Sequence, residues 1–289
     1  MLKKVFTILT VVLLIILPFL VGIPISKYSP YVEANSFKTY VIIWTVISIV
    51  FVSIAVIILK FYSQSFDKLL LGGLMFFLLV SPIVGIIGLA AAPDLSVKML
   101  EHPEREHLRY IFLFIAAMLF AAFFIFLLRS NSSKITNSAR WIITVIFILA
   151  FAEFTWEFSH HFLYPEALKE WINKGKNAAE FGKNYDNISI INIGVLGRLI
   201  QFSLIIWLSI HLYKLRNIKI WSPIITVILS LIGIVSASVI YVTQMNIPKG
   251  FEILFLFFIP GIPFLLFYWL GVGLLTKLKK NEIPGCKPL

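Results

Sequence analysis

Residues 110–128 read YIFLFIAAMLFAAFFIFLL, without one charged side chain. A helix needs about 20 apolar residues to cross a hydrocarbon core of about 30 Å. Similar stretches recur along the chain, and the expected spans are residues 5–23, 39–59, 69–92, 110–128, 141–160, 188–212, 220–243 and 251–276. Because lipid offers the backbone no hydrogen-bond partner, such segments cross as helices. We therefore predict an all-α, polytopic integral membrane protein, a bundle of eight transmembrane helices.

The composition leaves little for a soluble domain. The chain has 289 residues, of which 60% are hydrophobic and 13% charged, whereas a soluble domain carries about 25% charged residues. The longest polar loop, residues 161–187, is shorter than an independently folding domain. We expect residues 1–289 to form a single transmembrane domain.

The net charge of +11 is distributed unevenly over the loops. With the N-terminus inside and alternating loops, the inner segments hold Lys3, Lys4, Lys60, Lys68, Arg129, Lys134, Arg140, Lys214, Arg216, Lys219, Lys277, Lys279, Lys280 and Lys287. Only Asp67 and Glu282 oppose them, while the outer segments hold both signs in equal number. Short basic loops stay in the cytoplasm, so both termini are predicted to be cytoplasmic. The excess charge is expected to meet anionic lipid headgroups, and we expect no nucleic-acid partner.

Two features near the ends of the sequence bear on these expectations. Lys3 and Lys4 before an apolar run also resemble a secretory signal, but no small-residue cleavage site follows, so we expect the first span to be retained. Cleavage would leave seven spans with the N-terminus outside. The single cysteine, Cys286, excludes an intramolecular disulfide and a cysteine-based metal cage.

Residues 161–187 are expected to contain a short helix on the outer side. Pro165 suits the first turn of a helix. The apolar face of that helix would consist of Ala167, Leu168, Trp171 and Ile172. Such a helix either lies in the membrane interface or packs on the outer ends of the bundle, and both alternatives stay open here.

Small residues and prolines predict where helices approach one another or bend. Gly233 and Ala237 lie one turn apart in the seventh span, and this spacing lets two helix backbones come close. Pro260 and Pro263 interrupt the eighth span, where each removes a backbone donor. We expect a kink there that is architectural or lines a cavity.

The fifth span carries an unusual set of polar residues. Glu153, Glu157 and His160 follow a spacing that places them on one helix face, and His161 lies one turn after Glu157. Glu153 lies about 12 Å from the helix end at His161, at 1.5 Å per residue. Carboxylates at that depth are costly and face a partner, water or the interior of the bundle.

The sixth span supplies the expected partner. Arg198 lies about 15 Å from the outer end of its span, close to the depth of Glu153. Gln201 lies on the same face. We predict an ion pair of Arg198 with Glu153 or Glu157, which either fixes helix register or belongs to a ligand or proton site that also includes Gln201 and Trp156.

The same region admits a metal hypothesis. Glu157 and His160 form a Glu-x-x-His element, and Glu104 and His107 form another. This spacing occurs in di-iron carboxylate bundles, and carboxylates with imidazoles suit iron, manganese or zinc. The candidate ligands are Glu157, His160, His161, Glu104 and His107. The alternative is a group of interfacial histidines and solvated loop acids.

Three classes of function stay open. A non-catalytic membrane protein (an assembly partner, subunit or sensor) with an outward-facing Glu/His/Arg pocket is preferred, because no complete catalytic motif is present. The alternatives are a proton- or cation-coupled small-molecule carrier and a metalloenzyme acting on a lipid or quinone at the outer face. The expected partners are membrane lipids, a small molecule or ion, and a further membrane protein or second copy. The preferred location is the bacterial inner membrane.

Overall fold

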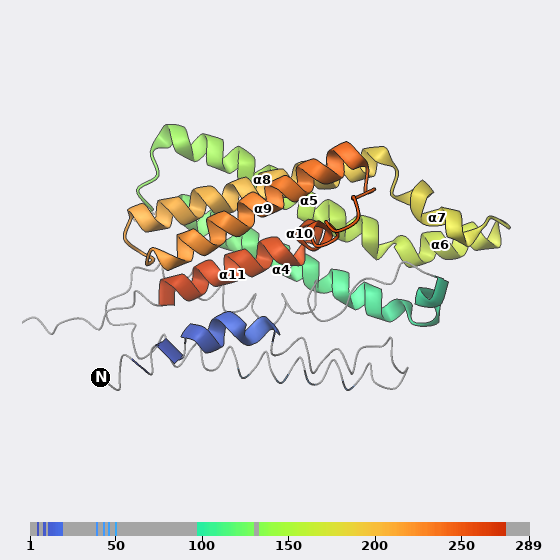
Figure 1. Ribbon diagram of the computed structural model, residues 1–289, viewed down its shortest axis with the longest axis horizontal. Helices are drawn as coiled ribbons and strands as arrows, with labels where there is room; N and C mark the ends of the chain where they lie inside the picture. The colour runs from blue at the N-terminus through green and yellow to red at the C-terminus, as the bar shows by residue number, and fades with distance from the viewer. Residues whose placement is uncertain are drawn as a thin grey trace, which may run out of the picture.

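The computed structural model describes residues 97–129 and 133–275, with residues 11–19 and a few single positions before residue 51. Every element in these residues is helical (Figure 1). The named elements are η3 (Val97–Glu101), α4 (Pro103–Arg129), α5 (Asn137–Phe162), α6 (Tyr164–Asn173), α7 (Ala178–Tyr185), α8 (Ile188–Lys214), α9 (Trp221–Thr243), α10 (Leu254–Phe258) and α11 (Gly261–Leu275).

Four helices in the described part of the chain are long and apolar enough to cross a membrane. They are Glu106–Arg129, Asn137–Asn173, Ile188–Lys214 and Trp221–Thr243, and the second of these stretches comprises α5 and α6. These helices coincide with the expected spans at 110–128, 141–160, 188–212 and 220–243, so an all-helical membrane architecture is confirmed in this coarse form. The expected spans at 39–59 and 69–92, and the ends of the span at 5–23, lie outside the described residues.

The last expected span, 251–276, is not one helix but two. α10 ends at Phe258, and α11 begins at Gly261. Between them, Ile259 has an extended backbone with φ −69° and ψ 134°. The residue before a proline avoids the helical region, and Pro260 itself has no N–H to continue the helix. The sequence Pro260–Pro263 therefore breaks the segment instead of only kinking it.

Residues 161–187 form two short helices joined at a turn. α6 has Pro165 in its first turn, as expected, and Asn177 caps α7 by accepting from Ala179 N at 3.0 Å. The buried side chains Leu168 of α6 and Phe181 of α7 form one apolar cluster with Met99 of η3. The apolar face of α6 thus packs against α7 and η3, and whether these helices also lie in the membrane interface stays a prediction.

The core of the bundle is rich in phenylalanine. Phe120 of α4 lies against the rings of Phe147 and Phe154 of α5 and Phe267 of α11, with centroid distances of 5.2–5.6 Å. Phe202 of α8 belongs to the same core, and a Cβ at Gly233 of α9 would overlap with its ring. The small residue expected at this position therefore does let α8 and α9 approach closely.

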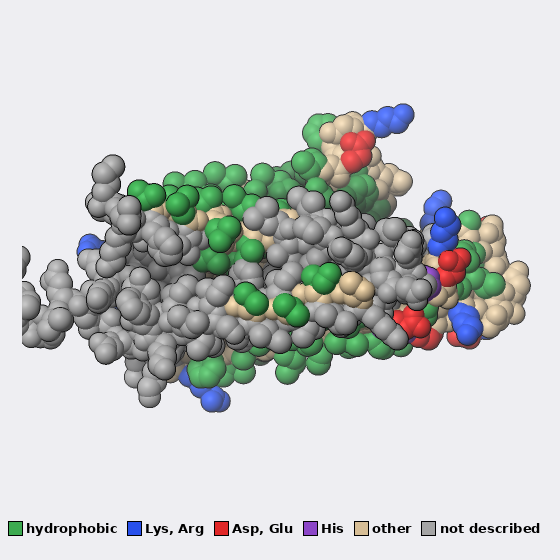
Figure 2. Space-filling view, turned by 90° about the horizontal axis from the view of Figure 1, so that it is seen from below, with side chains coloured by type: hydrophobic (Ala, Val, Ile, Leu, Met, Phe, Trp, Pro, Cys, Tyr) green, Lys and Arg blue, Asp and Glu red, His purple; other side chains and the backbone are tan. Residues whose placement is uncertain are grey.

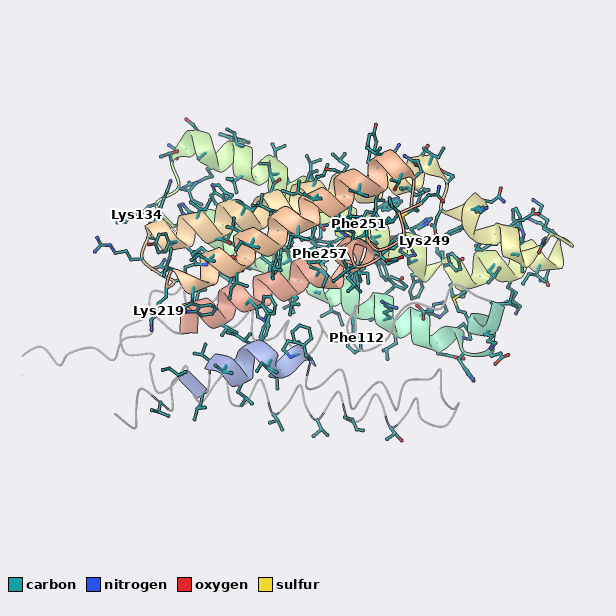
Figure 3. The ribbon with its side chains drawn as sticks, in the orientation of Figure 1. Phe112, Lys134, Lys219, Lys249, Phe251 and Phe257 are labelled. Atoms are coloured by element: carbon teal, nitrogen blue, oxygen red, sulfur yellow. The ribbon has the colours of Figure 1, made fainter. Side chains whose placement is uncertain are left out.

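The two ends of the bundle differ in character. The visible acidic side chains lie toward the end that carries α6 and α7 (Figure 2). Lys134 and Lys219, from the loops before α5 and before α9, lie at the opposite end (Figure 3). The long helices run between a mixed-charge end and a basic end, and the polar residues of α5 and α8 lie between them.

Candidate functional site

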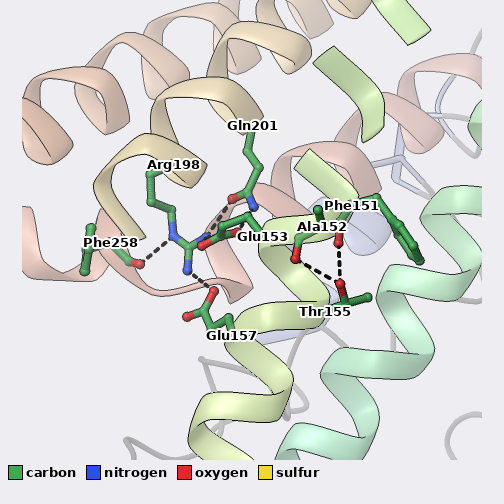
Figure 4. A network of polar contacts seen from close by, with 8 residues as sticks. All are labelled: Phe151, Ala152, Glu153, Thr155, Glu157, Arg198, Gln201 and Phe258. Carbon is green, nitrogen blue, oxygen red and sulfur yellow. Dashed lines mark hydrogen bonds and ion pairs between the residues drawn. The ribbon is translucent and has the colours of Figure 1, made fainter. Parts of the chain in front are cut away.

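Arg198 is the centre of a buried polar network between α5, α8 and α10 (Figure 4). Its side chain is 1% exposed. The Nη1 group donates to both oxygens of Glu153 at 3.3 Å, and Nη2 donates to Glu157 Oε2 at 2.5 Å. Both ion pairs that the sequence left as alternatives are therefore present. Whether these groups carry a ligand or protons stays a prediction.

Gln201 completes the contacts on the α8 side. Arg198 Nη1 donates to Gln201 Oε1 at 2.7 Å, and Gln201 Nε2 donates to Glu153 Oε2. The amide therefore bridges the cation and the carboxylate, accepting from one and donating to the other. This arrangement orients Glu153 against α8 and satisfies polar atoms that lipid would leave without partners.

Gly197 makes room for the Glu153 carboxylate. A Cβ at this position would overlap with Cγ, Cδ and Oε1 of Glu153. Gly194, one turn earlier on α8, lies against the ring of Phe258, where an added Cβ would come within 3.1 Å of Cζ. These two glycines let α5 and α10 approach the face of α8 that carries Arg198.

The backbone carbonyl of Phe258 is a further partner, and the helix break explains why it is free. In a continuous helix this oxygen would accept from the N–H of Ile262, four residues later. Ile262 N donates instead to Ile259 O at 3.1 Å. Arg198 Nε donates to the Phe258 oxygen at 2.7 Å and so satisfies it. A buried carbonyl without a partner would be costly.

The network contains two carboxyl groups for one guanidinium. If both were ionised, the cluster would carry one unbalanced negative charge in a buried site, where an uncompensated charge is expensive. One proton or one external cation restores the balance. The ratio of two carboxyl groups to one guanidinium therefore leaves one negative charge to be balanced when both carboxyl groups are ionised.

A cavity of about 700 Å³ lies beside this network. Glu157 and Arg198 form part of its wall, whereas Glu153 lies behind them. Much of the remaining wall is apolar, with Ile191 and Phe255 among its members. Its size lies within the range of sites that bind small molecules.

His160 and Trp156 belong to a joint between the C-terminal end of α5 and α7. His160 Nε2 lies 2.7 Å from Asp186 Oδ1, and its ring stacks on Trp156 and on Tyr185 at centroid distances of 5.1 and 4.4 Å. Tyr185 OH donates to His160 O at 2.8 Å. Burial raises the pKa of the Tyr185 hydroxyl, and Asp186 adds to this, so the donor stays protonated. Trp156 also lines the cavity.

The other candidate metal ligands point to different partners. His107 Nε2 lies 3.0 Å from Glu166 Oε1, and Glu104 is exposed. His161 stacks on Tyr110 at 5.0 Å and lines the cavity. In residues 97–129 and 133–275, no group of three or more His, Cys, Asp or Glu side chains is placed to hold a metal ion. The proposed iron, manganese or zinc ligands are therefore not brought together there.

The chain matches no protein-family model, no curated protein and no solved structure. Its function must therefore be argued from the geometry of its own residues.

Sequence reasoning did not identify three parts of this site. Phe258 contributes a backbone oxygen, and its only signal is the proline two residues later, which frees that carbonyl. Gly197 precedes Arg198, and it is needed because the Glu153 side chain lies against its backbone, which the sequence does not indicate. Asp186 is one of several loop acids, and nothing in its spacing marks it as the partner of His160.

Proposed function

We propose that the chain is a membrane carrier that moves a small molecule in a step coupled to protons or another cation, with Glu153, Glu157 and Arg198 as the coupling site. The observation that carries this proposal is a buried guanidinium shared by two carboxylates beside a cavity of about 700 Å³. Ionisable groups inside a membrane bundle mark ion or substrate pathways. A protein that only needed helix register would gain little from the second carboxylate.

The broken segment at α10 and α11 supports the same proposal. Carriers commonly bind substrates and coupling ions where a membrane helix is interrupted, because the interruption offers backbone groups to the site. Here the carbonyl of Phe258 contacts Arg198 directly. A shift of α10 would therefore alter the bonds of the guanidinium and, through it, those of both carboxylates.

The orientation and number of spans form part of the proposal. We infer eight spans with both termini in the cytoplasm of a bacterial cell, embedded in the inner membrane. The basic loops that contain Lys134 and Lys219 lie at one end of the bundle, and this supports a cytoplasmic position for that end (Figure 3). The cavity would then open toward the outer side, near α7 and the link before α8.

The test is solute-induced proton movement in liposomes that contain the full chain. A pH-sensitive dye inside the vesicles reports proton flux when small cations, anions or neutral solutes are added outside. We expect one class of solute to change the internal pH, and Glu157→Gln to abolish the response. The matched control is Glu180→Gln, because Glu180 is an exposed acid on α7. Flux that is absent for every solute class, or equal in Glu157→Gln, contradicts the proposal.

A non-catalytic assembly partner is the second candidate. The observation that favours it is that Nε, Nη1 and Nη2 of Arg198 are each hydrogen-bonded within the bundle, as expected for a lock that joins three helices. Replacing a buried ion pair by apolar residues of similar size often leaves stability unchanged. A folded Glu153→Leu/Glu157→Leu/Arg198→Met variant that keeps its function in cells would favour this candidate over the carrier.

A further inference from the structure

We propose that the cavity beside Glu157 binds an organic amine, with its ammonium head at the Glu157 carboxylate and its apolar body against the aromatic wall. This inference rests on the proposed function, since it names the class of substrate that the coupling site would take. It excludes anions and uncharged solutes as the main substrates.

The charged side chains of the wall are Glu157 and Asp186, which are acidic, and Arg109, Lys183 and Arg198, which are basic. Arg109 faces Glu106 at 4.0 Å, Asp186 contacts His160 at 2.7 Å and Lys183 is exposed, so the unbalanced buried charge of the wall is that of the Arg198 cluster.

Glu157 is the carboxylate of the network that lines the cavity, and Arg198 Nη2 contacts one of its two oxygens, Oε2. Because Arg198 is shared with Glu153, its single charge cannot balance both carboxylates. A ligand that brings one positive charge to Glu157 neutralises the cluster, and a proton on the carboxyl does the same. The amine and the proton would therefore exclude each other.

The wall also offers hydrogen-bond acceptors. Among the cavity-lining residues, His161 Nδ1 and Gln244 Oε1 are buried atoms without a hydrogen-bond partner in the described part of the chain, whereas Arg109 Nη1 lies 4.0 Å from Glu106 Oε2 and pairs with it. The Gln244 amide is oriented by its Nε2 group, which donates to Tyr241 O at 2.6 Å, so its oxygen is left as an acceptor. His161 lies one turn after Glu157 on α5, on the same face. An ammonium group offers donors and no acceptor, which matches a carboxylate, an imidazole nitrogen and an amide oxygen.

Aromatic side chains form another part of the cavity wall. Trp156, Tyr110, Phe255 and Phe258 bring aromatic rings to the cavity from α4, α5 and α10. Ring faces attract cations, most strongly where water is excluded. They also remove the apolar body of a ligand from water. Because the two buried arginines of this wall are already paired with carboxylates, its aromatic rings and Glu157 suit an amine with a hydrocarbon or aryl body better than a sugar or a carboxylate.

The experiment is calorimetric titration of the detergent-purified full chain with three probes of the same shape: phenethylammonium, phenethyl alcohol and hydrocinnamate. We expect binding of phenethylammonium at neutral pH, with at least tenfold weaker binding of the alcohol and of the carboxylate. Glu157→Gln should weaken the binding of phenethylammonium at least tenfold. Glu180→Gln, which removes an equal charge from the exposed surface of α7, should leave this binding unchanged.

A second variant keeps the test informative if Glu157→Gln does not fold. His161→Phe preserves a ring against Tyr110 and removes Nδ1. It should therefore weaken the binding of phenethylammonium without creating affinity for hydrocinnamate. The inference is overturned if the alcohol or the carboxylate binds as tightly as the amine, or if no probe binds at millimolar concentration. Amine binding without any proton flux would support the amine site and contradict the carrier function. Proton flux driven only by anions would support the carrier function and contradict the amine site.

Discussion

The Nε–H of Arg198 donates to the carbonyl oxygen of Phe258 at 2.7 Å, and this bond joins the middle of α8 to the break between α10 and α11. The bond exists because Pro260 prevents the helix from continuing and so frees a carbonyl in the interior. The proline is therefore a cause of the polar site as well as of the bend. The arrangement makes several measurable predictions.

Loss of the guanidinium should destabilise the bundle strongly. Arg198→Met leaves two carboxylates without a counter-charge, and breaking one partner of a buried pair costs about 3–5 kcal/mol. The measurement is the free energy of unfolding in micelles. The control is Arg129→Met, because Arg129 is exposed at the end of α4. Equal stability of the two variants would show that the network is solvated and contributes little.

Gly197→Ala should be destabilising although alanine is the better helix former. The new Cβ would overlap with the Glu153 carboxylate, and overpacking of this kind costs about 1–3 kcal/mol. Gly182→Ala on α7 is the matched control, since its Cβ meets only Tyr164 Oη, at 3.7 Å. The melting temperature of both variants checks the prediction, and a Gly197→Ala protein as stable as the control contradicts it.

Replacing both prolines, as Pro260→Ala/Pro263→Ala, should allow the helix to continue across the break, since either proline alone would interrupt it. The alanine at position 260 gains an N–H that can bond the carbonyl of Leu256, which is now reached by Ile259 N at 3.4 Å. Amide hydrogen exchange between residues 258 and 263 should slow, and Arg198 should lose its acceptor at Phe258. The control is Pro223→Ala, in the first turn of α9, where proline is compatible with a helix. Exchange that is equally fast in both variants would contradict the prediction.

Asp186→Asn should loosen α6 and α7 from the bundle. The change weakens the 2.7 Å contact with His160, and hydrogen bonds to charged groups contribute about 1.5–3 kcal/mol. Trypsin should then cleave faster in the exposed segment that contains Lys174 and Lys176. Glu252→Gln, at an exposed acid before α10, should leave the cleavage rate as it is. Unchanged cleavage of Asp186→Asn would show that ring stacking alone holds the joint.

The partners of Arg198 could be predicted because a charged side chain within a membrane span needs an opposite charge, and few are available there. The depth of Arg198 and the spacing of Glu153 and Glu157 on α5 limited the pairing to two carboxylates, and the structure has both. The apolar runs predicted the long helices for the same reason, since the backbone in lipid must satisfy itself.

The rest of the site depends on information that spacing does not contain. Gly197 matters because α8 is rotated so that this residue faces Glu153 of α5. That rotation could not be predicted, because α8 is apolar on all sides and its sequence does not mark one face as buried. Asp186 lies in a loop that contains several acids. Any of these acids could be solvated, so the sequence does not mark Asp186 as the partner of His160. The Glu-x-x-His elements predicted shared ligands, yet His160 and His107 each pair with a different acid, because helix ends offer many local partners.

Gly197 also sets how α8 can move. The bare backbone here lies directly against the Glu153 side chain, so a lengthwise shift of α8 past α5 would bring a residue with a side chain against that carboxylate. Lys214 lies about 26 Å from Gly197 along the helix axis, at 1.5 Å per residue. A rocking motion of about 10° would carry that basic end through about 4 Å while scarcely displacing the carboxylates. A small rotation of α8 at the charge cluster would thus become a larger displacement at the basic end of the helix.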